Sequence, residues 1–539
     1  MNKPEQIGPV WAQLLCPALL LLFIVSLSCA RPDGEVRNLI LLIGDGMGPQ
    51  QIGLALTYAR YATKPTMKDR ELSIERIMRD GTTGLALTSP EGFLVTDSAA
   101  SGTQIATGRK SRPGMIGLDG DGNPAETILE KARRSGRAAG LVSDTRITHA
   151  TPASFAAHRP VRMMENEIAG DLLDSGTEVL LSGGLRHWLP DNVGDASSSE
   201  NVYLEKIIPD HLSLRSARRD GRNLIREAQQ RGYETVFDRK ALIGSSSSKL
   251  LGLFAESEMP DAIRVSRTRS DGNRVIPTLA EMTGKALEVL SRNEKGFFLM
   301  VEAGQIDYAC HHSDAGRLLH EMLIFDETLD SIFRWARGRS DTLVVVMADH
   351  ETGGFAFSYS RYNVPPEMKL PGTAFRGREY SPMNNYARPF LLDRLYAQKK
   401  SFNDIRLEFD ILPPGSRTPG NLARIFNDAV EFKISAEQAG DILAMEDAPP
   451  GFMARGERIH RLPRIHDFKE FYMAPGEGRN NLMGRAVARE QSVVWATGTH
   501  TASPVILVAW GPEKHSRRFG GVHHTTEVHE LMAEVLELR

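Results

Sequence analysis

Two hydrophobic patterns alternate along the chain. Short aliphatic runs are typical of strands that are buried on both faces, and the stretches between them carry apolar residues at helical spacing. Because strands and helices take turns, we predict an α/β fold with a large, mostly parallel central sheet and helices on both faces. The expected strands are residues 38–43, 140–142, 178–181, 297–301, 342–347 and 505–510, and the expected helices are residues 125–134, 222–231, 279–292, 317–335 and 526–538.

One region departs from this alternation. Residues 360–490 are rich in Pro, Gly and Arg, with Pro-Pro pairs that begin at positions 365, 413 and 449. Such a composition is typical of turns and loops rather than of a buried sheet. We therefore predict one catalytic domain, formed by residues 31–359 and 491–539, with residues 360–490 as an insertion in it.

The N-terminus has the pattern of an export signal. Lys3 precedes an uncharged stretch from residue 6 to residue 30, which contains the apolar run 14–27. This layout predicts a signal peptide over residues 1–29, with an uncleaved membrane anchor as the alternative. Cys29 fits a lipoprotein signal, which would add a lipid anchor, whereas cleavage after Ala30 fits an ordinary signal. Either way we expect an exported protein of the periplasm or cell envelope.

Composition changes this picture little. The 539 residues include 65 Lys and Arg against 68 Asp and Glu, a net charge of −3, and 41% are hydrophobic. These values are ordinary for a folded protein and give no reason to expect nucleic-acid binding. Since Cys16 and Cys29 lie in or at the end of the expected signal, we do not expect a disulfide scaffold.

The end of the first expected strand and the start of a short helix both carry residues that suit catalysis. The first strand runs into the motif GDGMG, which contains Asp45. This is not a dinucleotide fingerprint, because the third glycine would fall at Pro49; a carboxylate there suits a metal, or simply a turn. Ser98 follows Asp97 at the start of a small-residue helix. Backbone N–H groups at such a position favour an anion or an activated hydroxyl, although the pair could simply cap the helix.

More candidate ligands follow later strands. Asp307 and His311 are four residues apart, which places them on one helical face at metal-ligand spacing. Asp349 and His350 are adjacent at the end of strand 342–347, where both can turn toward one ion or remain a solvated pair. The remaining candidates of this kind are Glu302, at the end of strand 297–301, and His500.

A further group lies near a helix start. Thr151 precedes Pro152, which is a good start for a helix, with His149 beside it and Arg162 about three turns on. The planar guanidinium of Arg162 can bind two oxygens of a tetrahedral dianion. A lone His or Arg is, however, more often a capping or surface residue.

Together these residues offer three candidate metal sets. Sets of nitrogen and oxygen donors suit zinc, and the set with oxygen donors alone suits magnesium. The sets are Asp307, His311 and His500; Asp45, Asp349 and His350; and Asp45 with Thr151 and Glu302.

The order of the motifs resembles that of the alkaline phosphatase family. GDGMG, TDSAAS, HATPA, VEAGQID, ADHETGG and GTHT follow one another between about residues 37 and 530. The resemblance implies the alkaline phosphatase fold, with a crown-like insertion, and hydrolysis of small-molecule phosphate monoesters through a phosphoserine. It implies two zinc ions at the first two sets and one magnesium at the third. We expect a monomer or a homodimer.

The resemblance also implies roles for single residues. Ser98 becomes the nucleophile, and Arg162 binds the phosphate. Tyr308 stands where other members have Lys or His in indirect contact with phosphate, so we expect it to contribute to phosphate binding. His149 stands where some members have Asp, so we expect it to modulate the third metal site.

Other functions remain as alternatives. The nearest is a phosphodiesterase of the same superfamily, which would have less use for Arg162 as a dianion clamp. A sulfatase would need a C/S-x-P-x-R motif at the nucleophile, which the sequence after Ser98 lacks. A secreted metal- or phosphate-binding protein without turnover belongs to another class. A P-loop nucleotidase is disfavoured, because no GxxxxGK[S/T] motif occurs.

Overall fold

The computed structural model of this chain describes residues 35–63, 71–195, 197–454, 457–466, 468–473 and 476–538. The predicted signal peptide, with Cys29, lies outside these residues. Val36–Arg539 pack together as one unit. Among the helices that the structure describes, none is both long and apolar enough to cross a membrane.

The aliphatic runs form a ten-stranded sheet in the order β20-β2-β19-β8-β1-β7-β3-β4-β6-β5. Neighbouring strands are parallel except at β19, which is antiparallel to both β2 and β8, so the predicted mostly parallel sheet is confirmed. All six expected strands are present. The strands are β1 (Asn38–Gly44), β2 (Thr82–Leu87), β3 (Ala138–Arg146), β4 (Val179–Gly183), β5 (Glu234–Val236), β6 (Leu250–Leu253), β7 (Phe297–Ala303), β8 (Thr342–Met347), β19 (Val505–Trp510) and β20 (Gly521–His524).

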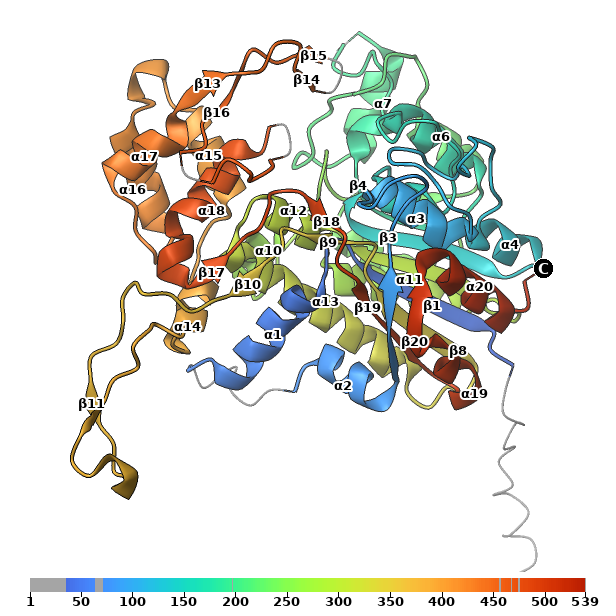
Figure 1. Cartoon of the computed structure of the whole chain (residues 1–539). Helices are drawn as coiled ribbons and strands as arrows, with labels where there is room; N and C mark the ends of the chain where they lie inside the picture. Colours follow the sequence, from blue (N-terminus) through green and yellow to red (C-terminus); the bar gives the residue numbers. More distant parts are fainter. Residues whose placement is uncertain are drawn as a thin grey trace, which may run out of the picture. The chain divides into compact units, whose positions relative to one another are not determined.

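Helices pack on both faces of this sheet (Figure 1). Several begin with a side-chain cap that the sequence supplies, such as Thr278 in a capping box with Glu281. The helices around the sheet are α1 (Pro49–Tyr61), α2 (Ser73–Asp80), α3 (Ser98–Thr107), α4 (Ile128–Arg134), α5 (Ala150–Ala153), α6 (Glu165–Asp174), α7 (Ser199–Ile207), α8 (Leu224–Gln230), α9 (Arg239–Gly244), α10 (Ala262–Thr268), α11 (Leu279–Leu290), α12 (Gln305–His311), α13 (Ala315–Ala336), α19 (Glu513–Ser516) and α20 (Thr525–Val535).

The register of the central strands brings their carboxyl ends together. Ile43 of β1 pairs with Glu302 of β7 on one side and with Met347 of β8 on the other. Ser143 of β3 pairs with Glu302 in turn. Because ligand groups of parallel sheets gather beyond the carboxyl ends of the strands, this edge is where a site is expected.

Residues between β10 (Ala356–Phe357) and β17 (Val493–Val494) form a separate group of elements. These two strands pair antiparallel, with Ala356 opposite Val494, so the segment leaves and re-enters the sheet domain at one place. This pairing supports our proposal that residues 360–490 are an insertion. Between β10 and β17 lie α14 (Phe390–Tyr396), α15 (Phe402–Asp410), α16 (Pro419–Ala429), α17 (Ala436–Leu443) and α18 (Gly478–Gln491), with strands β11 (Met368–Lys369), β12 (Glu379–Tyr380), β13 (Met445–Asp447), β14 (Met453–Ala454), β15 (Glu457–Arg458) and β16 (Arg461–Pro463).

A buried carboxylate joins this segment to the sheet domain. Asp314 caps α13, and its Oδ1 accepts hydrogen bonds from the backbone N–H of Arg317 (3.0 Å) and from Nε2 of Gln398 (2.7 Å). Its Oδ2 accepts a hydrogen bond from the backbone N–H of Phe402 at 2.8 Å. Asp314 is fully buried. If its carboxylate were removed, water could not take its place as acceptor for these three donors.

We predict that Asp314→Ala destabilises the protein by roughly 2–4 kcal/mol, because it removes a helix cap and leaves buried donors unpaired. Urea denaturation would measure the loss. The matched control is Asp428→Ala, which removes only an exposed pair with Arg424 and should cost less than about 0.5 kcal/mol. Equal losses in the two variants would contradict the structural role of Asp314.

Candidate functional site

Ser98 is the first residue of α3, and its hydroxyl faces a histidine. The Asp97 carboxylate caps the helix by accepting a hydrogen bond from the N–H of Ala100 at 3.0 Å. Ser98 Oγ lies 3.2 Å from Nε2 of His350. Ser98 is only 1% exposed and lies at the positive end of the helix dipole. This position favours negative charge on its oxygen.

Asp45, Asp349 and His350 form what we term the serine-side cluster. Each residue offers one ligand atom, and these atoms lie within 4.8 Å of one another. His350 Nε2 lies 3.4 Å from Asp45 Oδ1 and 3.3 Å from Asp349 Oδ2. Asp349 is held by its other oxygen, which accepts hydrogen bonds from the backbone N–H groups of Gly46 and His350.

Asp307, His311 and His500 form a second group, the outer cluster, whose ligand atoms also lie within 4.8 Å of one another. His311 Nε2 lies 3.2 Å from Asp307 Oδ2 and 3.1 Å from His500 Nε2. The His350 and His500 rings stack with centroids 3.7 Å apart, so the two clusters are neighbours. Gly46 (φ +73°) makes this approach possible, because a Cβ there would lie 2.9 Å from Asp307.

Each imidazole of the two clusters is oriented through its other ring nitrogen. His311 Nδ1 lies 2.8 Å from the carbonyl oxygen of Gly498, and His500 Nδ1 lies 2.9 Å from that of Thr96. His350 Nδ1 lies 3.2 Å from Thr352 Oγ1, which also donates a hydrogen bond to Asp307. With Nδ1 engaged, Nε2 of each ring is directed into a cluster, as in protein sites that bind metals.

The third cluster contains Asp45 again, with His149 and Glu302. Glu302 uses Oε2 to accept hydrogen bonds from Ser143 and Thr145, and its Oε1 lies 3.6 Å from His149 Nδ1. The sequence placed Thr151 here and His149 beside the site. In the structure His149 offers a ligand atom directly, while the buried Thr151 hydroxyl has no hydrogen-bond partner in the described chain.

Burial and neighbouring charges shift the pKa values of all three residues in the serine-side cluster. Burial and the carboxylates of Asp349 and Asp307 raise the pKa of Asp45 well above its usual range. Burial and Asp307 raise the pKa of Asp349 to about 7. Burial lowers the pKa of His350 to about 4, so this ring is neutral at neutral pH and can act as a ligand. Bound cations would compensate the crowded carboxylates.

Several buried atoms of the clusters lack hydrogen-bond partners, which fits metal ligation. Buried polar atoms in folded proteins are nearly always paired, so orphaned oxygens at one place indicate a missing partner. Carboxylate and hydroxyl oxygens are suitable ligands for divalent cations. The atoms are Oδ1 and Oδ2 of Asp45, Oδ2 of Asp349, Oε1 of Glu302 and Oγ1 of Thr151.

Arg162 lies beside the nucleophile candidate. Its Nη1 donates a hydrogen bond to Asp97 Oδ2 at 3.1 Å, and its Nη2 lies 3.1 Å from His149 Nε2. Asp97 thus connects the cap of α3 with the guanidinium. Since Ser98 and Arg162 line the same cavity, the remaining N–H groups can reach an anion at Ser98.

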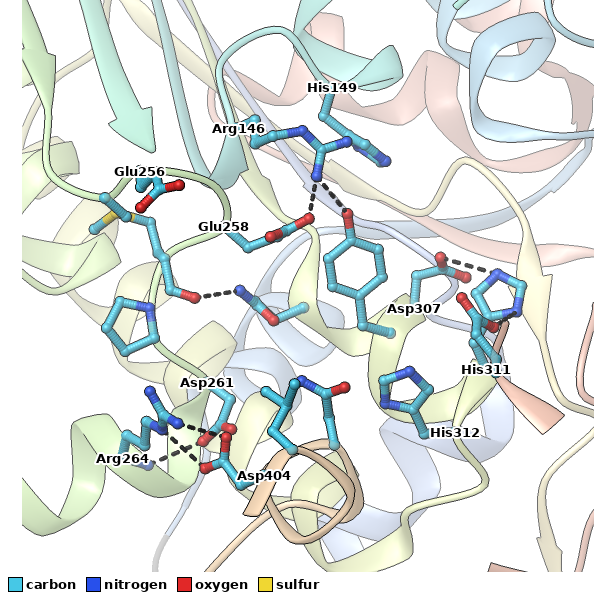
Figure 2. Close-up of a pocket in the computed structure, with 18 of the residues that line it drawn as sticks. Arg146, His149, Glu256, Glu258, Asp261, Arg264, Asp307, His311, His312 and Asp404 are labelled. Atoms are coloured by element: carbon cyan, nitrogen blue, oxygen red, sulfur yellow. Dashed lines mark hydrogen bonds and ion pairs between the residues drawn. The ribbon is translucent and has the colours of Figure 1, made fainter. Parts of the chain in front are cut away.

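Tyr308 occupies a different position from Arg162. Its ring lies edge-on to His149 with centroids 5.9 Å apart, and its hydroxyl is 3.5 Å from Nη1 of Arg146. Arg146 also forms ion pairs with Glu165 and Glu258. Figure 2 shows Arg146 and Glu258 on the wall of the cavity, away from Asp307 and His311. Tyr308 as a phosphate contact stays a prediction.

Some residues of the site were not found from the sequence. Thr352 orients two candidate ligands, and Arg146 lies 3.5 Å from the Tyr308 hydroxyl. Thr352 belongs to the motif ADHETGG and Arg146 ends β3, but a threonine or an arginine at such a position is common on protein surfaces. Only the distances to Asp307, His350 and Tyr308 distinguish them.

We predict that divalent cations stabilise the protein, because they would compensate buried carboxylates. With zinc at about a hundredfold over its Kd, linkage gives roughly 2.7 kcal/mol of added stability. Melting temperatures of chelator-treated protein, with and without added zinc and magnesium, would measure it. Asp45→Asn should lose most of the shift, because Asp45 belongs to two clusters, whereas Asp428→Asn should keep it. A melting temperature that is the same with and without added zinc and magnesium would contradict the prediction.

Comparison with known proteins agrees with this geometry. The alkaline phosphatase family model matches residues 36–387. Alkaline phosphatase 4 of Bacillus subtilis is 33% identical over 60% of this chain, and the chain spans 63% of that protein. Alkaline phosphatase of Escherichia coli is 33% identical over 63% of this chain and 74% of its own length. The crystal structure of Thermus thermophilus alkaline phosphatase superposes with a TM-score of 0.71 at 28% identity, covering 94% of this chain and 92% of that one. The chain therefore belongs to the alkaline phosphatase family.

Proposed function

We propose that this protein hydrolyses phosphate monoesters to an alcohol and inorganic phosphate through a phosphoserine at Ser98. The observation that carries the proposal is the position of Ser98 Oγ, 3.2 Å from His350 Nε2 and at the start of a helix. Arg162 lines the same cavity, which suits a phosphoryl dianion. Similar proteins named alkaline phosphatases support the reaction class.

Two zinc ions and one magnesium ion are the proposed cofactors. The serine-side and outer clusters offer imidazole and carboxylate donors, which suit zinc. Asp45, Glu302 and Thr151 offer the oxygens that suit magnesium, and His149 would modulate that site. When bound, the ions would lower the pKa of the Ser98 hydroxyl and of a water molecule, and would neutralise charge on the leaving oxygen.

Arg162 and the start of α3 bind the phosphoryl group in this proposal. Asp97 holds the guanidinium through Nη1, so the planar fork is oriented before the substrate arrives. Two N–H groups of the fork match two oxygens of a phosphate. Tyr308, whose hydroxyl lies 3.5 Å from Nη1 of Arg146, is the proposed additional contact with the phosphate.

The reaction then proceeds in two displacements at phosphorus. Ser98 gives up its hydroxyl proton to solvent and its Oγ attacks phosphorus, the bond from phosphorus to the ester oxygen breaks, and the leaving oxygen takes up a proton from solvent to give the alcohol. Because Ser98 adjoins His350, the leaving oxygen opposite it faces the side of His311 and His500. Water enters on that side and hydrolyses the phosphoserine, which regenerates Ser98 and releases phosphate.

The location and assembly of the protein are further proposals. We propose export to the periplasm or cell envelope, with either cleavage of the signal or lipidation of Cys29. Mass measurement of the mature N-terminus distinguishes the two. Small-molecule phosphate monoesters are the proposed partners, and the protein would act as a monomer or a homodimer.

Replacing the nucleophile tests the chemistry. We expect Ser98→Ala to lower kcat for a chromogenic phosphate monoester by at least about a thousandfold, because no covalent intermediate can form. Chelator should abolish wild-type turnover, and a chromogenic diester should be a much poorer substrate. The control Ser331→Ala, on α13, should keep full activity. Full activity of Ser98→Ala would contradict the phosphoserine, and preference for the diester would favour the phosphodiesterase alternative.

Replacing the anion clamp tests substrate binding. Arg162→Ala removes hydrogen bonds between charged groups, so kcat/KM for the monoester should fall by about ten- to a hundredfold. The inhibition constant of inorganic phosphate should rise in parallel. Arg159→Ala serves as the control, because Arg159 pairs with Asp171 and takes no part in the proposed site. Unchanged phosphate inhibition in Arg162→Ala would refute this role.

A further inference from the structure

The cavity at Ser98 is larger than a phosphoryl group requires. Its volume is about 860 Å³, within the range of roughly 300–1,000 Å³ that pockets for small organic ligands occupy. Ser98 lines it together with His311 and the Arg264–Asp404 ion pair. Figure 2 shows this ion pair on the opposite side of the cavity from Arg146. The space beyond the phosphoryl position can therefore hold the organic part of a substrate.

The direction of the leaving group selects one wall of this cavity. In the proposed reaction the leaving oxygen faces His311 and His500, so the organic group would extend past the C-terminal end of α12. There the first turn of α18 lies against α12: Asn481 Nδ2 donates hydrogen bonds to the carbonyl oxygen of His311 and to Ser313 Oγ. Glu477 Oε2 also lies 3.5 Å from His311 Nδ1. The start of α18 is thus held in place beside the site.

Asn480 presents an unused amide on this wall. Its side chain lines the cavity and is 1% exposed. Its Oδ1 is buried and has no hydrogen-bond partner among the described residues. Leaving a buried amide unpaired costs free energy, so a structure that keeps one facing a cavity indicates a ligand that pairs with it.

Neighbouring groups on this wall are also polar. His312 Nδ1 lies 3.3 Å from Nη1 of Arg317, so its other ring nitrogen is the one that remains for a ligand. On α15, Asn403 Oδ1 accepts a hydrogen bond from Nη2 of Arg406 at 2.8 Å, and both residues line the cavity. This wall therefore carries both hydrogen-bond donors and hydrogen-bond acceptors, which suits a ligand with several hydroxyl groups.

We propose that this wall is a leaving-group subsite that selects phosphate monoesters of hydroxyl-rich alcohols, such as sugars and polyols, with Asn480 as the specificity-determining residue. Because the proposal rests on the phosphomonoesterase function proposed above, it concerns only which esters are preferred. An apolar leaving group of the same size would leave the amide of Asn480 unpaired, which penalises it relative to a sugar.

Two substrates of similar size and attachment test the preference. Glucose 6-phosphate and cyclohexylmethyl phosphate are both esters of a primary alcohol on a six-membered ring, and they differ mainly in hydroxyl groups. We expect the metal-loaded wild-type protein to show a kcat/KM at least about tenfold higher for glucose 6-phosphate. Equal values, or a preference for cyclohexylmethyl phosphate, would overturn the subsite.

Variants at Asn480 test whether this residue causes the preference for glucose 6-phosphate. Asn480→Leu, which keeps the size of the side chain, should lower kcat/KM for glucose 6-phosphate by roughly three- to tenfold and leave that for cyclohexylmethyl phosphate unchanged or higher. Asn480→Ala should act in the same direction. Asn421→Leu, on α16 and outside the cavity, is the matched control and should keep the wild-type ratio.

Inorganic phosphate separates the possible failures. Its inhibition constant should be the same in wild type and in both Asn480 variants, because the phosphoryl site is not altered. A parallel loss of kcat/KM for both substrates in the Asn480 variants would overturn the assignment of Asn480. Hydrolysis of neither substrate by the wild type, together with turnover of a diester, would overturn the proposed function and the subsite with it.

Discussion

Mutual repulsion of buried carboxylates at one edge of the sheet is the constraint on which the site depends. Asp45, Glu302 and Asp349 follow or end three adjacent parallel strands, so they lie together at one edge of the sheet. Burial and these neighbours raise the pKa of Asp45, and its oxygens have no hydrogen-bond partners. Bound positive charge would stabilise such an arrangement, so we expect the chemistry of the site to depend on its cations.

Hydrogen bonds to the imidazoles orient their ring nitrogens toward the two clusters. Backbone carbonyls of Gly498 and Thr96 orient His311 and His500, while Thr352 serves both His350 and Asp307. Hydrogen bonds of this kind fix which ring nitrogen is available as a ligand, because the other one is engaged. The serine-side and outer clusters consequently lie side by side rather than merging, with Ser98 next to only one of them. This asymmetry gives the proposed reaction an attacking side and a leaving side.

Hydrogen bonds between residues far apart in the sequence connect the predicted insertion, residues 360–490, to the candidate site. Asp314 ties α13 to α15, and Asn481 ties α18 to the end of α12. The segment that lines the outer part of the cavity is thereby positioned by the same helix that supplies Asp307 and His311. A family that keeps its phosphoryl chemistry can alter the preferred alcohol through such a segment, because the two functions occupy different walls of one cavity.

The sequence by itself determined the central strands, the mostly parallel sheet and the candidate ligands, because continuous aliphatic runs and acidic residues after them are local signals. It did not predict strands β2, β5, β6 and β20, which lie at or next to the two edges of the sheet and are only three to six residues long. It treated His149 as a neighbour of the third set, whereas the fold places this ring within that cluster. Only the tertiary structure decided which ring nitrogen faces each cluster, that Thr352 and Arg146 contact site residues, and that Asn480 faces the cavity. These features depend on distances between segments up to several hundred residues apart, which no local pattern of side chains specifies.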